Sequence, residues 1–163
     1  MMQTAIFVLF SLITLGAGLA VVTNNNIFHS ALYLILSFVG VAGLYILLEA
    51  PFMAAVQIMV YVGAIAVLIV FAIMLTRRLM DEDVVQRNEQ WVLSALGAVL
   101  LFAGLAFILF QANWPVLAGA VPGDTISDLG RDFMGVHLIP FEVTSILLLA
   151  ALVGSILIAR EDK

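Results

Sequence analysis

Long apolar segments separated by shorter polar ones make up most of the 163-residue chain. Each is about as long as a helix must be to cross the ~30 Å hydrocarbon core of a bilayer, at about 1.5 Å rise per residue. The apolar segments cover residues 2–22, 29–48, 51–75, 91–111 and 141–159. The pattern therefore predicts an all-α integral membrane protein with five transmembrane helices.

The connection between the second and third apolar segments is very short. Only Glu49 and Ala50 precede Pro51, and proline suits the first position of a helix, where its missing N–H costs nothing. The second and third helices should therefore form a tight antiparallel hairpin. In the same way, we expect Pro140 to open the last helix and to place Glu142 in its first turn, near the positive end of the helix dipole.

The other connections are polar. They are an Asn-rich turn at residues 23–28, a charged stretch at 76–90 and a Gly- and Pro-containing loop at 112–139. We expect His29 to open the second helix. No internal repeat is present, so the sequence predicts a single membrane domain over residues 1–163.

Composition and charge agree with this prediction. Hydrophobic residues make up 64% of the chain and charged residues 10%, against about 25% charged residues in soluble domains. The chain has no cysteine, which excludes disulfides, thiolate-bound metals and iron–sulfur clusters within it. A net charge of −5 with six scattered Lys and Arg residues argues against nucleic-acid binding.

The basic residues predict the orientation, because Lys and Arg concentrate in cytoplasmic connections. Five spans put Arg131 alone on one side and the other basic residues on the opposite side. We therefore expect the N-terminus outside and the C-terminus in the cytoplasm. The residues on the predicted cytoplasmic side are Arg77, Arg78, Arg87, Arg160 and Lys163.

The third segment carries Gln57, Tyr61 and Gly63 at membrane depth and no charged residue. An amide or a phenol without a partner costs several kcal/mol in hydrocarbon, so these side chains should face protein or water. Proton relays in membranes usually hold ionisable residues at mid-depth. Here the intramembrane candidates are Glu49 and Glu142, both at helix ends on the same outer side, so this chain alone has no acid to hold a proton halfway across.

Two interpretations of Tyr61 and of Gly63 stay open on the pattern alone. Tyr61 can relay or gate through hydrogen bonds, or simply satisfy a carbonyl of a neighbouring helix. Gly63 can permit close helix packing, or mark a point where the helix switches between α and π winding. Glu49 and Glu142 can be interfacial charges at helix starts. The two histidines, His29 and His137, are too isolated from other ligands to make a metal site.

Three motifs resemble one family of membrane subunits. The stretch AAVQIMVYVGAIAVLIVFAIML, residues 54–75, resembles the third helix of the J-type subunits of NADH:quinone oxidoreductase (respiratory complex I), the counterparts of mitochondrial NADH dehydrogenase subunit six. Two further motifs also resemble this family and occur in the family's order. They are HSALYLILSF at residues 29–38 and DLGRDFMGVHLIPFEVTSILLLAALVGSILIAR at residues 128–160. The family often has Asn-Pro before His-Ser-Ala, whereas this chain has Asn26-Ile27-Phe28 before His29.

The resemblance implies a membrane subunit of a proton-pumping enzyme that has no redox centre and no catalytic activity alone. NADH, FMN, iron–sulfur clusters and quinone would be bound in partner subunits. The implied partners are the small A-, K- and N-type membrane subunits, the quinone-site H-type subunit and the lipid bilayer. The implied location is an energy-transducing membrane, the bacterial plasma membrane in particular.

The resemblance also implies a role for the third helix. In the family this helix forms a π-bulge, and rotation about it opens or closes a water path between the quinone region and the antiporter-like subunits. Tyr61 and Gly63 fall on the matching positions, which favours the functional interpretation of both. We therefore expect a gate formed by Tyr61 and the backbone of residues 60–64, which includes Val60 and Gly63, with Gln57 on the same proton path.

Alternatives to this function remain. The same subunit could serve a ferredoxin-linked or hydrogenase-type relative, because it touches no electron donor. It could also be a purely structural assembly subunit. An autonomous channel or transporter fits poorly, since no charged site lies at mid-depth.

Overall fold

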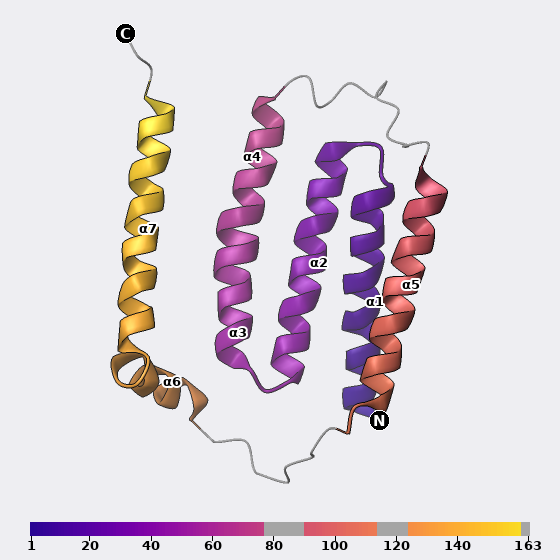
Figure 1. Ribbon diagram of the computed structural model, residues 1–163, viewed down its shortest axis with the longest axis horizontal. Coiled ribbons are helices and arrows are strands. Elements are labelled where there is room, and N and C mark those ends of the chain that lie inside the picture. Colours follow the sequence, from indigo (N-terminus) through magenta and orange to yellow (C-terminus); the bar gives the residue numbers. More distant parts are fainter. Residues whose placement is uncertain (77–89, 114–123, 161–163) are drawn as a thin grey trace. The chain divides into compact units, whose positions relative to one another are not determined.

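Helices make up nearly all of the described chain. The computed structural model describes residues 1–76, 90–113 and 124–160, and this part contains no strand (Figure 1). The first helices are α1 (Met2–Thr23), α2 (Ile27–Leu47), α3 (Pro51–Val56), the π-helix η1 (Gln57–Ala66) and α4 (Val67–Leu75). They are followed by α5 (Trp91–Gln111), α6 (Thr125–Met134) and α7 (Leu138–Ala159). The chain divides into two compact units, residues 1–120 and 121–163, and each is described by itself.

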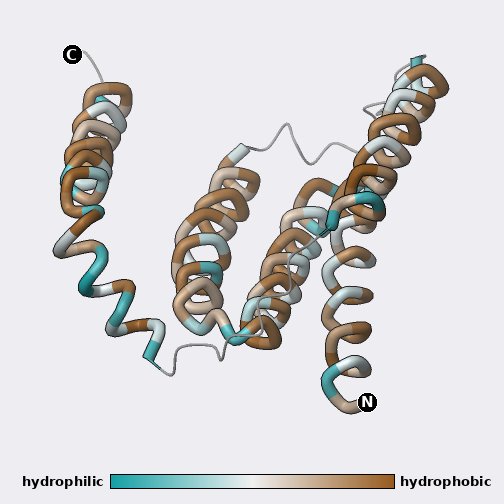
Figure 2. Tube along the Cα trace, turned by 60° about the horizontal axis from the view of Figure 1, so that its bottom comes forward, coloured by the Kyte–Doolittle hydropathy of each residue, from teal (hydrophilic) through white to brown (hydrophobic). Residues whose placement is uncertain are grey.

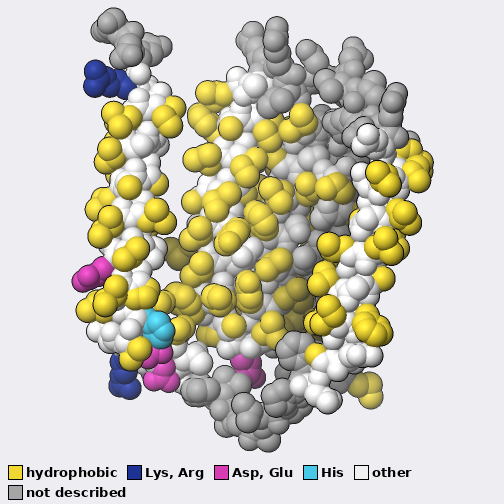
Figure 3. Space-filling model, viewed as in Figure 1, with side chains coloured by type: hydrophobic (Ala, Val, Ile, Leu, Met, Phe, Trp, Pro, Cys, Tyr) yellow, Lys and Arg dark blue, Asp and Glu magenta, His cyan; other side chains and the backbone are white. Residues whose placement is uncertain are grey.

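Five helices of the described chain are long and apolar enough to cross a membrane, which confirms the predicted number of spans. The third span, Pro51–Leu75, is continuous through α3, η1 and α4. Hydrophobic residues predominate along the spanning helices (Figure 2), and apolar side chains lie along them on the face shown in Figure 3. Of the six basic residues, only Arg131 and Arg160 lie within the described chain, so the orientation of the termini stays a prediction. The single membrane domain stays a prediction as well.

In the first unit, α2 contacts both α1 and the third span. The seam between α1 and α2 is built from small residues. A methyl group on Gly40 would lie 3.1 Å from the backbone nitrogen of Thr14, and one on Gly43 would lie 2.7 Å from Cζ of Phe10. The Ser37 hydroxyl donates to the Thr14 carbonyl oxygen at 3.1 Å across the seam. Glycine is therefore what lets these two helices approach so closely.

The hairpin predicted between the second and third spans is confirmed. Leu48, Glu49 and Ala50 make the turn, and the Ala50 N–H donates to the Tyr45 carbonyl oxygen at 3.0 Å. Glu49 has φ of 56°, a left-handed conformation that few residues other than glycine adopt. Pro51 lies in the first turn of α3, as expected.

The start of α2 corrects one expectation. The helix begins at Ile27 rather than at His29, because Asn26 caps it. The Asn26 side-chain oxygen accepts from the N–H groups of Phe28 at 3.0 Å and His29 at 3.2 Å, satisfying two of the donors that a helix start leaves unpaired.

In the second unit, the helix α6 occupies part of the stretch that the sequence analysis assigned to a loop. The Asp124 side chain caps it by accepting from the Ser127 N–H at 3.2 Å. The glycines at 130 and 135 favoured a loop, yet an exposed glycine costs only about 1 kcal/mol in a helix. Gly135 lies just after the end of α6.

The last span starts earlier than predicted. It begins at Leu138, so Pro140 is its third residue and Glu142 its fifth, outside the first turn. The N–H groups of a first turn have no intrahelical partner, which is why a helix can extend N-terminal to a proline there. The prediction that Pro140 opens the helix and that the dipole favours Glu142 in its first turn was therefore wrong.

Candidate functional site: the π-helical centre of the third span

The third span changes its winding in the middle. Ten residues, Gln57–Ala66, form a π-helix between the α-helical halves α3 and α4. The flanking residues Val56 and Val67 keep ordinary helical dihedrals, with φ near −60° and ψ of −42°. In a π-helix the hydrogen bonds join residues five apart rather than four, and such segments appear mostly as single turns, often at functional sites. Sequence alone left α and π winding open; the structure has π.

The π winding determines which side chains of the span face α2. Gln57 and Ala66 are both buried, at 7% and 1% exposure, and Ile73 is buried further along. Gln57 and Ala66 are nine positions apart, which at about 100° per residue in an α-helix gives about 900° and places them on opposite faces. They share one face here because each π turn contains more residues than an α turn, so nine positions make close to two full turns. From Ala66 to Ile73 the spacing is seven, which again fits one face of an α-helix.

Tyr61 lies at the centre of the π-helix and is held by an aromatic contact. Its ring meets the ring of Phe38, on α2, edge to face, with centroids 5.5 Å apart and an interplanar angle of 74°. The side chain is 43% exposed, so part of it stays open to whatever surrounds the unit. The contact with Phe38 was not visible in the sequence, because periodicity does not tell which residues on two apolar helices meet.

Gln57 is the only buried polar side chain among the described residues. None of the buried side-chain nitrogen or oxygen atoms among the described residues lacks a hydrogen-bond partner, so the amide of Gln57 is not a buried unpaired group. A side-chain amide can donate and accept, so this group is suited to bind a water molecule or a polar group of another chain. It lies about one turn before Tyr61 on the same helix.

Gly63 touches the backbone of its own helix. A methyl group at this position would lie 3.3 Å from the carbonyl oxygen of Ile58, five residues earlier, which is closer than ordinary van der Waals contact. The π winding itself brings these two groups together. The absence of a side chain at Gly63 therefore favours the π form.

Of the remaining predicted site residues, Val60 lies in the same π-helix and the two acids lie outside it. Val60 is in η1 and is 43% exposed, Glu49 is exposed in the hairpin turn, and Glu142 is exposed in α7. The structure does not bring the two acids together within one unit. His29 and His137 lie in different units, and no group of three or more metal-ligating side chains occurs among the described residues.

The chemistry available to this centre is hydrogen bonding rather than charge storage. An amide and a phenol can each donate and accept a hydrogen bond, and neither carries a charge here. The fold and this centre define a class: a polytopic helical membrane protein whose third span carries an uncharged π-helical segment.

Comparison with known proteins gives the family. Residues 17–158 match the family described as NADH-ubiquinone/plastoquinone oxidoreductase chain 6. The chain is 40% identical over 160 residues to NAD(P)H-quinone oxidoreductase chain 6 of Synechocystis sp., covering 96% of this chain and 80% of that protein. It is 39% identical over 165 residues to F(420)H(2) dehydrogenase subunit J of Methanosarcina mazei, covering 99% and 93%. The chain belongs to the chain 6 family of quinone oxidoreductase membrane subunits, which confirms the resemblance seen in its motifs.

Proposed function

We propose that this chain is a membrane subunit of a proton-translocating NADH:quinone oxidoreductase and that its third span gates the path between quinone reduction and proton movement. The π-helix Gln57–Ala66 is the observation that carries the gating proposal. It places a buried amide and a half-exposed phenol in the middle of a span that otherwise has only apolar side chains.

The gate works through rotation. If the π turns convert to α winding, residues after the segment turn by about half a turn relative to Gln57. Ala66 and Ile73 then leave the face that packs on α2, and Ala64 and Leu68 replace them. Leu68 is 68% exposed in the π form, so the change carries a bulky side chain from outside to inside. Water that reaches the amide of Gln57 in one form is excluded in the other.

The chain supplies the gate and other subunits supply the redox chemistry. Partner subunits hold NADH, FMN, the iron–sulfur clusters and quinone, and the A-, K-, N- and H-type membrane subunits surround this one. A chain without cysteine provides no thiolate for a cluster, which supports this division. The complex lies in an energy-transducing membrane, in bacteria the plasma membrane.

The electron donor is the least constrained part of this proposal. This chain is about equally similar to a relative named for NAD(P)H, at 40% identity, and to one named for F420H2, at 39% identity. Its similarity to a relative therefore does not depend on the electron donor of that relative's complex. An in-gel NADH oxidation stain of the native complex, purified through a tag on this chain, distinguishes an NADH-oxidising complex from a relative with another donor.

The gate is tested against a purely structural role by Tyr61→Phe. This change keeps the ring contact with Phe38 and removes only the hydroxyl. We expect normal assembly and a two- to tenfold fall in coupled proton translocation, about the effect of losing one hydrogen bond of about 0.5–1.5 kcal/mol. Proton uptake per quinone reduced is measured in vesicles containing the assembled complex.

Tyr33→Phe is the matched control for this change, because Tyr33 on α2 has similar exposure, at 37%. It should pump like the wild type. If the Tyr61→Phe complex pumps like the wild type, the hydroxyl of Tyr61 plays no part in the gate. If the variant fails to assemble, the purely structural role is favoured.

A further inference from the structure

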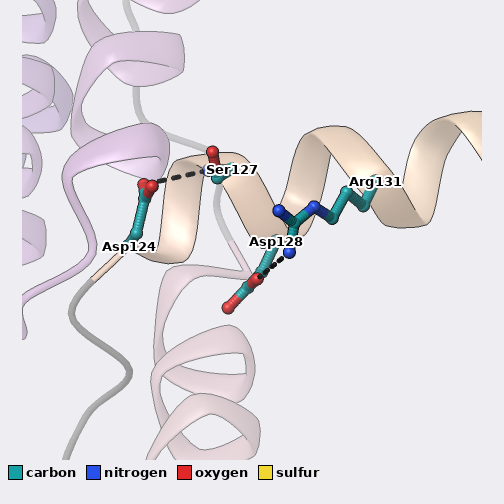
Figure 4. Close-up of polar contacts among 4 residues, drawn as sticks. All are labelled: Asp124, Ser127, Asp128 and Arg131. Carbon is teal, nitrogen blue, oxygen red and sulfur yellow. Dashed lines mark hydrogen bonds and ion pairs between the residues drawn. The ribbon is translucent and has the colours of Figure 1, made fainter.

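The helix α6 has one apolar and one polar face, unlike the spanning helices. Ile126, Leu129 and Phe133 follow the i, i+3, i+7 spacing of a single helical stripe. On the other side lie Asp128 and Arg131, which form an exposed ion pair at 3.8 Å (Figure 4). At ten residues and about 15 Å, α6 is too short to cross a bilayer.

The position of α6 relative to α7 is set by the chain and by a ring contact. Only Gly135, Val136 and His137 separate the two helices, and the His137 N–H donates back to the Asp132 carbonyl oxygen at 2.9 Å. The ring of Phe133 stacks on Phe141, with centroids 5.9 Å apart and an interplanar angle of 26°.

This contact shows which way the apolar stripe faces. Phe141 is the fourth residue of a span that begins at Leu138, so it lies just inside the membrane end of α7. Phe133 reaches that ring from α6, which means that the stripe is on the side of α6 toward the hydrocarbon. Ile126 belongs to the same stripe and is 58% exposed.

We propose that α6 is an interfacial helix that lies in the membrane surface, with the stripe of Ile126, Leu129 and Phe133 in the boundary between headgroups and acyl chains. Amphipathic helices that bind a membrane surface lie in the plane of the interface with their apolar face buried about 5–10 Å. The occupant of the stripe is lipid because α7 enters the bilayer only three residues later. This inference does not depend on the gate or on the electron donor.

The charge of α6 indicates whether its binding to the membrane surface needs anionic lipid headgroups. Asp124, Asp128 and Asp132 outnumber Arg131, so the helix and its cap carry a net negative charge. Interfacial helices that select anionic lipids are rich in Lys and Arg instead. The stripe should therefore insert equally well beside zwitterionic headgroups and need no anionic lipid.

The test uses spin labels on the assembled complex in vesicles. Ile126→Cys places the label on the apolar stripe, and Ser127→Cys, the matched control, places it on the adjacent polar face. The complex without either change gives the background from cysteines of partner subunits. Only preparations with the mass of the intact complex are measured. Collision rates with oxygen, which concentrates in lipid, and with a water-soluble nickel chelate report the surroundings of each label.

We expect the ratio of oxygen to nickel collisions to be several-fold higher at position 126 than at 127. The ratio should be the same in phosphatidylcholine vesicles as in mixtures with phosphatidylglycerol. Equal exposure of both labels to the nickel chelate would overturn the proposal, because α6 would then lie in water. Shielding of the label at 126 from both reagents would also overturn it, since a protein partner and not lipid would cover the stripe.

Discussion

A Gly63→Leu variant is expected to assemble and to lose most of its coupled proton translocation. The new side chain begins 3.3 Å from the Ile58 carbonyl oxygen, one π turn earlier, and so opposes the π form. Overpacking of this kind costs about 1–3 kcal/mol, which shifts the balance between two helix forms about 5- to 150-fold. The measurement is proton translocation and quinone reduction by the purified complex in vesicles.

The control for added bulk is Gly16→Leu, also in a membrane span. A methyl group at Gly16 meets nothing within 4 Å in the described chain, so the same substitution there leaves the π-helix untouched. Gly16→Leu should keep more of the coupled activity than Gly63→Leu. Wild-type pumping and quinone reduction by an assembled Gly63→Leu complex would contradict the gating account.

The second large effect is expected at the seam between α1 and α2. In Gly40→Ala the added methyl group would collide with the Thr14 hydroxyl and lie 3.1 Å and 3.2 Å from the backbone N and Cα of Thr14. Backbone atoms cannot move aside as a flexible side chain can, so the two helices must separate. We expect a loss of about 1–3 kcal/mol in packing and a several-fold fall in the amount of assembled complex, measured on native gels.

Gly18→Ala is the matched control on the same seam, because the same methyl group there lies 3.8 Å from the Ser37 hydroxyl, an ordinary contact. It should assemble at close to the wild-type level. Equal abundance of both variants would show that the seam is not tightly packed in the complex. A Gly40→Ala complex that assembles fully but fails to pump would place this seam in the gate instead.

The spans were predictable because membrane length and hydrophobicity impose them almost alone. The 25-residue third span came out with the predicted bounds, and Pro51 with its missing N–H marked the start. The start of the last span, α7, was harder to predict. Pro140 is a start signal in the sequence, yet the first turn tolerates proline at its third position as well, so α7 reaches back to Leu138.

The sequence carries a signal for the helix α6. Ile126, Leu129 and Phe133 have helical spacing after a capping Asp124, but the nearby glycines and prolines of residues 112–139 favoured a loop. Ten residues are also below the length at which a hydropathy pattern stands out, and they are held by the contact with α7.

The sequence singles out Gln57, Tyr61 and Gly63, and the structure places all three in the π-helix η1, but their contacts were not predictable. Gln57, Tyr61 and Gly63 stood out because polar and flexible residues are conspicuous in a hydrocarbon environment. The ten-residue length of the π-helix, the Phe38 contact and the approach of Gly63 to Ile58 could not be predicted. They depend on how two apolar helices fit together, and many registers satisfy the same hydrophobic pattern.

The most direct test of the gate is to image the intact complex by electron microscopy at rest and during turnover, at a resolution that shows side chains. The account predicts two forms of the third span. One has Ala66 and Ile73 against α2, as here; the other has α winding through residues 57–66, with Ala64 and Leu68 in their place. A single π register in every particle of a complex that pumps at full rate would contradict it.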